Sequence, residues 1–132
     1  MKMQPDRLEG VNTISRQEPG RIWVHQTPFD SSILLPSRGS VVAWPVNAFE
    51  DLTAEHFEAI LALEPEVVIL GSGPKLRFPK PALWRALIDR GVGFEAMDTA
   101  AACRTYNVLA SEGRRVTAAL LQAAATPSGG RL

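Results

Sequence analysis

The residues with the clearest chemical potential lie in Gly71-Ser72-Gly73, directly after the most apolar short run of the chain. Two glycines after a strand form part of the dinucleotide-binding fingerprint G-x-G-x-x-G, in which the backbone approaches a pyrophosphate. The third glycine is missing because Leu76 takes its place, and Pro74 delays the helix that should begin inside the motif. Lys75 also lacks the neighbours of a Walker motif. The segment therefore predicts a turn that needs glycine for its geometry, and no cofactor is expected.

Four basic residues follow this turn and form a local basic cluster. Unpaired amides at the start of a helix attract anions, so a phosphate or carboxylate could bind beside the cluster. A solvated basic loop is the competing interpretation, and the zero net charge of the chain favours it. The cluster consists of Lys75, Arg77, Lys80 and Arg85.

No arrangement of residues predicts nucleophilic or metal chemistry. A reactive cysteine needs a nearby base or a positive field, and Cys103 stands in an alanine-rich run. His25 and His56 are the only histidines, and they have no metal-ligand spacing. Asp98 is better explained as a helix cap than as an acid catalyst. We therefore expect no catalytic residue, no metal site and a packing role for Cys103.

Composition narrows the classes of protein to which the chain could belong. Its 132 residues fit a single domain over 1–132, in which 1–10 and 124–132 are expected to be flexible. The 14 basic and 14 acidic residues cancel, which argues against a nucleic-acid partner. No stretch approaches the roughly 20 apolar residues of a membrane span, and the start lacks a signal peptide. These features predict a soluble, cytoplasmic protein without membrane insertion.

The segment Val67–Leu70 predicts the central strand of the fold. Its four apolar residues show no polar alternation, as expected for a strand with both faces buried in a sheet that is covered on both sides. The glycines that follow then lie at the carboxyl end of this strand. In open α/β sheets, ligands and partners bind at this edge.

The amino-terminal part predicts strands and turns. Alternation over Val11–Gln17 and a strand-like run over Arg21–His25 flank the turn signal Pro19-Gly20, which indicates a β-hairpin. A loop is expected over Thr27–Ser32. Two further strands are expected in the order Ile33–Leu35 and Val41–Trp44, the second of them buried.

The remainder alternates between helices and strands. The predicted helices are Ala54–Glu64 after the cap Thr53, Pro81–Arg90 with Leu83, Trp84, Leu87 and Ile88 facing inward, and Thr99–Glu112 after the cap Asp98. The predicted strands are Val92–Met97 and a final strand over Arg115–Leu121. On the last helix, we expect Tyr106 to point inward with its hydroxyl bonded, and Arg104 and Asn107 to face outward together. The order predicts an α/β domain with an additional amino-terminal β-hairpin.

Short motifs in the carboxyl-terminal half keep a characteristic order and spacing. They are Gly71-Ser72-Gly73, Met97-Asp98-Thr99, Ala102, Thr105-Tyr106-Asn107, Leu109, Glu112-Gly113-Arg114, Val116 and Ala118-Ala119-Leu120. Taken together, they are more specific than any single motif. Over roughly residues 33–122 the chain resembles a small family of domains of unknown function, which includes the mitochondrial complex I assembly factor three and the adipogenesis-associated protein.

The resemblance implies a three-layer α/β fold around a central mixed sheet, in which the last strand runs antiparallel to its neighbours. It implies no established enzymatic activity, because the mitochondrial relative acts as an assembly factor through protein contacts. The first functional hypothesis is therefore a non-enzymatic interaction or assembly module with an unidentified protein partner. The alternative is a protein or enzyme that binds a small anion. The predicted ligand or partner surface consists of Gly71, Ser72, Gly73, Lys75, Arg77, Asp98 and Thr99.

Overall fold

A computed structural model describes residues 10–123 of the chain. The predicted flexible ends, 1–10 and 124–132, therefore lie outside the described residues except for Gly10. That glycine lies in a turn with a φ of 81°.

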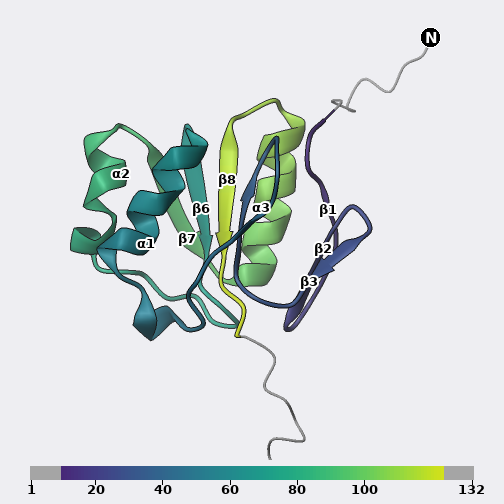
Figure 1. Ribbon diagram of the computed structural model, residues 1–132, viewed down its shortest axis with the longest axis horizontal. Helices are drawn as coiled ribbons and strands as arrows, with labels where there is room; N and C mark the ends of the chain where they lie inside the picture. The colour runs from purple at the N-terminus through teal and green to yellow at the C-terminus, as the bar shows by residue number, and fades with distance from the viewer. Residues whose placement is uncertain (1–9, 124–132) are drawn as a thin grey trace, which may run out of the picture.

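The fold is built on a five-stranded mixed sheet with the strand order β5-β4-β8-β6-β7 (Figure 1). Its strands are β4 (Ile33–Pro36), β5 (Val42–Ala43), β6 (Val67–Gly71), β7 (Gly93–Met97) and β8 (Val116–Leu120). Strand β6 is parallel to both β7 and β8, whereas β4 is antiparallel to β5 and β8. This confirms the predicted mixed sheet and the predicted final strand.

The direction of the final strand agrees with the prediction at one of its two neighbours only. Strand β8 is antiparallel to β4 only and runs parallel to β6. The reason is the connection: helix α3 (Thr99–Ser111) links β7 to β8 and returns the chain to the edge at which β7 began. Such a helical crossover joins parallel strands.

Helices cover both faces of the sheet and complete the three layers (Figure 1). Helix α3 lies on one face, and α1 (Ala54–Glu58) and α2 (Arg85–Asp89) lie on the other. The two helices predicted as continuous each include a 3-10 segment, η2 (Ala59–Leu63) after α1 and η3 (Pro81–Trp84) before α2. The inward orientation predicted for Ile88 is wrong, because its side chain is 47% exposed.

The amino-terminal hairpin is confirmed and gains a third strand. Strands β1 (Ile14–Glu18), β2 (Arg21–Val24) and β3 (Thr27–Phe29) form an antiparallel sheet of their own. The sequence predicted a loop at β3 because no glycine or asparagine marks the turn before it. The turn uses His25, whose φ of 55° is uncommon for a residue that is not glycine.

The predicted buried strand Val41–Trp44 is only partly correct. Strand β5 comprises two residues at the edge of the sheet, and both of them are exposed. Trp44 is buried and packs edge-on against Phe57, with ring centroids 6.2 Å apart. The apolar run therefore contributes its tryptophan to the core, while Val42 and Ala43 end the sheet.

The central strand β6 separates two apolar clusters, as its continuous apolar sequence predicted. Val67 and Ile69 pack in the cluster that includes α3, and Val68 and Leu70 pack in the cluster on the opposite face. All five residues of β6 are buried. Complete burial makes β6 a rigid support for the residues that follow it.

Helix α3 connects the hairpin sheet to the five-stranded sheet. The Tyr106 hydroxyl donates to the carbonyl oxygens of Asn12 (2.9 Å) and Pro36 (3.2 Å), which confirms that this side chain points inward. The outward orientation predicted for Asn107 is wrong. Its amide pairs with the backbone of Ile14, accepting from the N–H at 2.9 Å and donating to the carbonyl at 2.8 Å. A single polar side chain can thus substitute for a strand partner.

We predict that Asn107→Ala lowers the free energy of unfolding by about 1–3 kcal/mol, because both backbone groups of Ile14 lose their partner. Urea denaturation gives the total loss, and hydrogen exchange at the Ile14 amide shows whether the hairpin loosens first. Arg104→Ala is the matched control on the exposed face of α3. An equal loss in both variants would contradict this role for Asn107.

Candidate functional site: a groove at the carboxyl edge of the sheet

The carboxyl ends of three strands meet at one edge of the sheet. In the register of the sheet, Gly71 at the end of β6 lies opposite Met97 of β7 and Leu120 of β8. The Gly71–Gly73 turn and the Asp98–Thr99 start of α3 are therefore neighbours, as the parallel strands predicted.

Thr99 joins these strand ends through three hydrogen bonds. Its Oγ1 accepts from the Gly73 N–H at 2.9 Å and donates to the Leu121 carbonyl at 3.1 Å. Its own N–H donates to the Gly73 carbonyl at 2.9 Å. Because Thr99 is buried, the loss of its hydroxyl would leave two backbone groups without their partner.

Gly71 permits this arrangement because it has no side chain. A Cβ atom at this position would lie 2.9 Å from Thr99 Oγ1 and 3.0 Å from Thr99 Cα. Gly73 serves a different purpose, since its φ of 107° is strained for other residues. The two glycines thus set the approach of α3 to the sheet and the path of the turn.

Ser72 and Asp98 hold the local backbone in place. The buried Ser72 hydroxyl donates to the Lys75 carbonyl at 2.6 Å and accepts from the Arg77 N–H at 3.0 Å. Asp98 caps α3 by accepting from the Ala101 N–H at 2.8 Å, which confirms the predicted cap. Both side chains are therefore engaged in shaping the loop and the helix start.

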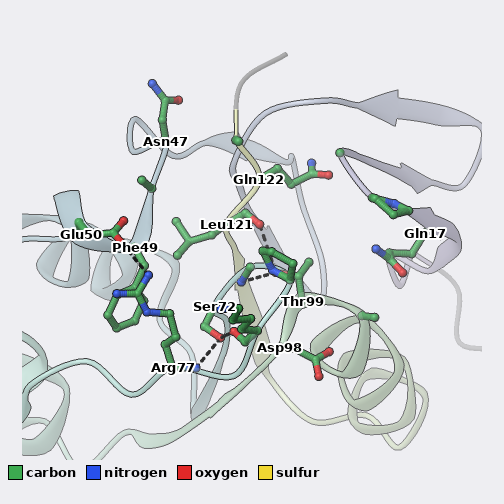
Figure 2. A pocket seen from close by; sticks show the side chains of 18 residues that line it. Gln17, Asn47, Phe49, Glu50, Ser72, Arg77, Asp98, Thr99, Leu121 and Gln122 are labelled. Atoms are coloured by element: carbon green, nitrogen blue, oxygen red, sulfur yellow. Dashed lines mark hydrogen bonds and ion pairs between the residues drawn. The ribbon is translucent and has the colours of Figure 1, made fainter. Parts of the chain in front are cut away.

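A groove of about 670 Å³ opens at this edge (Figure 2). Its walls come from the hairpin turn 17–20, the segment 47–50, the loop 72–77, the start of α3 and the exit of β8 at 121–123. Gly71 does not line the groove, but its backbone packs closely against Thr99, which does. The other residues of the predicted surface line the groove: Ser72, Gly73, Lys75, Arg77, Asp98 and Thr99.

The charge of Arg77 is compensated inside the groove. Its Nη1 atom lies 2.7 Å from Glu50 Oε2, and its guanidinium stacks 4.3 Å from the centre of the Phe49 ring (Figure 2). The hydrogen bond from Arg77 lowers the pKa of the Glu50 carboxyl. Lys75 also lines the groove and has no ion pair within residues 10–123. Two residues of the predicted basic cluster line the groove, Lys75 and Arg77, and Lys75 is the one whose charge has no partner there.

Several residues that line the groove were not predicted from the sequence. They come from elements distant in the chain, and no local motif marks them. Gln122 shows how they are held: its Nε2 donates to the carbonyls of Phe29 (3.1 Å) and Ser31 (2.8 Å). The unpredicted lining residues include Gln17, Asn47, Phe49, Glu50, Leu121 and Gln122.

The loop between β6 and η3 exposes two large apolar side chains next to the groove. Phe78 is 71% exposed and Leu76 is 51% exposed, although their neighbours Lys75 and Arg77 line the groove. Pro74 and Pro79 restrict the backbone on either side. An exposed aromatic side chain on a restrained loop provides contact area at low entropic cost.

Cys103 and His56 are both engaged in the fold. Cys103 is buried, and burial raises the pKa of its thiol to about 12. The His56 Nδ1 accepts from the Thr53 N–H at 3.0 Å and so caps α1. Between residues 10 and 123, no cluster of three His, Cys, Asp or Glu could hold a metal ion. In the same range, no helix is long and apolar enough to cross a membrane.

We predict that native Cys103 reacts with Ellman's reagent at pH 8 about 100-fold more slowly than the urea-unfolded chain. The raised pKa also has a consequence for stability. The neutral thiol is favoured in the fold, so its contribution is complete below the ordinary pKa of 9.0 and is lost as the pH rises toward 12. Rapid labelling of the native protein would contradict a pure packing role.

Comparison with known families assigns the chain. A model described as "Protein of unknown function (DUF498/DUF598)" matches residues 14–121, which include both sheets and the whole of α3. The chain belongs to this family. The region of the groove, including the Gly71–Gly73 turn and Thr99, lies within the matched residues.

The chain is also similar to a named relative and to two solved structures. The bovine "NADH dehydrogenase [ubiquinone] 1 alpha subcomplex assembly factor 3" is 41% identical over 95 residues, which are 70% of this chain and 50% of the bovine protein. The chain thus spans about half the length of this relative. A crystal structure from Bordetella parapertussis is 41% identical with a TM-score of 0.82 and covers 88% of this chain and 99% of that one. A solution structure from Bordetella pertussis, described as a Mth938-like domain, is 33% identical with a TM-score of 0.82 and covers 98% of both chains.

Proposed function

We propose that the protein is a non-enzymatic interaction module that binds a partner protein through the carboxyl edge of its sheet. The observation that carries this proposal is the pair of exposed side chains Leu76 and Phe78, held on a restrained loop beside the groove. Aromatic residues surrounded by polar groups are typical anchors of protein interfaces. The groove next to them would receive a side chain of the partner.

The name of the bovine relative supports a role in assembly. That protein is named as an assembly factor of NADH dehydrogenase, and an assembly factor must recognise other proteins. For this chain we propose a partner that is itself a subunit of a larger complex. The cytoplasmic location expected from the sequence is part of the proposal, and fractionation of cells that express the protein would test it.

We predict that Leu76→Ser combined with Phe78→Ser weakens partner binding at least about tenfold, because both anchors are lost from the interface. The control is Val108→Ser on α3, since Val108 is also exposed, at 55%. The measurement is quantitative co-purification of the tagged full chain, together with urea denaturation to show that each variant is folded. Equal recovery of partners by both variants would refute the use of this surface.

A second candidate function is the binding of a small anion in the groove, supported by the uncompensated charge of Lys75. Thermal-shift measurements with inorganic phosphate and short carboxylates test it. Lys75→Ala should abolish any stabilisation, whereas Lys80→Ala, on the same loop but outside the groove lining, should retain it. No shift at millimolar concentrations would remove this candidate.

A further inference from the structure

The outer edge of β7 is the longest unpaired strand edge of the five-stranded sheet. Strand β7 ends the strand order and has only β6 beside it, over five residues from Gly93 to Met97. The edge at the opposite end belongs to β5, which has two residues. A free edge of this length can pair with another extended chain.

The hydrogen bonds between β6 and β7 show which backbone groups this edge presents. The Gly93 N–H donates to the Glu66 carbonyl at 3.0 Å, and the Met97 carbonyl accepts from the Ser72 N–H at 2.8 Å. Backbone groups in a parallel ladder alternate in direction, so Gly93, Glu95 and Met97 turn theirs toward β6. Phe94 and Ala96 turn theirs outward, and no residue between 10 and 123 pairs with them. Each offers one donor and one acceptor to an incoming strand.

The two sides of this edge differ in chemistry. Phe94 is half-buried and stacks on Trp84 with ring centroids 4.4 Å apart, and both belong to the apolar cluster on the face covered by α1 and α2. Glu95 points to the opposite face, because successive strand residues alternate. It is exposed and has no ion pair in the described range of the chain. An incoming strand would therefore meet apolar side chains on one side and a carboxylate on the other.

We infer that the β7 edge binds an extended segment of a partner protein in which apolar residues alternate with a basic residue opposite Glu95. The charge selects this occupant over a second copy of the chain. In the antiparallel register that pairs all the outward backbone groups of two β7 edges, Phe94 would bond with Ala96 of the other copy and the two Glu95 side chains would face each other. Like charges directly opposite destabilise a strand pair, whereas opposite charges stabilise it.

This surface stands independently of the groove, although the Met97 end of β7 lies at the same edge of the sheet as the groove. Met97 at the end of β7 is level with Gly71, from which the Leu76–Phe78 loop departs. A segment paired along β7 would thus run toward that loop or away from it. Main-chain bonds would supply affinity, and the alternating side chains would supply specificity.

A peptide titration tests the inference. The probe is a capped synthetic peptide of alternating lysine and valine, compared with a peptide that has glutamate in place of each lysine. With the isotope-labelled full chain, saturation by the lysine peptide should slow hydrogen exchange at the Phe94 and Ala96 amides about tenfold or more. The lysine peptide should bind about fivefold more tightly than the glutamate peptide. Glu95→Gln should reduce this difference without loss of the fold.

Three results would overturn the inference. One is the absence of protection at Phe94 and Ala96 at millimolar lysine peptide. Another is equal affinity for the two peptides in the unmodified chain. The third is protection that grows with protein concentration in the absence of peptide, since this would mean that a second copy occupies the edge.

Discussion

Gly71→Ala is expected to lower the free energy of unfolding by about 1–3 kcal/mol, although the change adds only one methyl group. The added Cβ would lie 2.9 Å from Thr99 Oγ1 and 3.0 Å from Thr99 Cα, and a backbone atom cannot move aside as the tip of a flexible side chain can. The start of α3 must therefore shift away from β6. Urea denaturation measures the loss, and hydrogen exchange at the Gly73 amide reports the displaced bond to Thr99.

Gly93→Ala is the matched control, because it makes the same substitution in the neighbouring strand. Its added Cβ would meet Val67 Cγ2 at 3.4 Å, an ordinary contact. We expect the free energy of unfolding to change by no more than about 0.5–1 kcal/mol. A small increase is expected, because alanine loses less backbone entropy than glycine when a strand forms. A similar loss in both variants would show that the close approach at Gly71 is not what holds α3.

Thr99→Val is expected to cost about 2–4 kcal/mol, because the isosteric methyl group cannot pair with the Gly73 N–H or the Leu121 carbonyl. Both backbone groups belong to the floor of the groove. We therefore also expect faster hydrogen exchange at the Gly73 amide. Partner binding should weaken by more than the lower stability of the variant alone would cause. Calorimetry and the co-purification measurement check these two effects.

Thr99→Ser distinguishes the contribution of the Thr99 hydroxyl from that of its methyl group. Serine keeps both hydrogen bonds and loses one buried methyl, so we expect a loss of about 1 kcal/mol and a Gly73 amide that remains protected. If the serine and valine variants lose equal stability and show the same exchange at the Gly73 amide, Thr99 acts through packing. The role proposed for its hydroxyl in holding Gly73 and Leu121 would then be wrong.

The central strand and the helix cap could be predicted because their determinants are local. Val67–Leu70 is apolar without alternation, and the glycines that follow mark its end. Asp98 precedes a long helical pattern and accepts the bond expected of a cap. The parallel arrangement of β6 and β7 then places Gly71 beside Thr99, so the floor of the groove follows from sequence order.

The walls of the groove could not be predicted because their determinants are tertiary. Glu50 and Arg77 are 27 residues apart, and no periodicity links them. The same applies to Asn107, whose amide replaces a strand partner for Ile14, 93 residues away. The parallel pairing of β8 with β6 was not predicted for a related reason, since it depends on the crossover through α3 rather than on the residues of the strand.

Photo-crosslinking at position 78 tests most directly whether the groove-side loop binds a protein partner. The full chain carries benzoylphenylalanine in place of Phe78, or in place of Val108 as the control on α3, in cells that express the protein. We predict a single crosslinked partner at position 78, no crosslink at position 108, and loss of the product in the Gly71→Ala background. Equal crosslinking at both positions, or none at position 78, would contradict the proposed interaction surface.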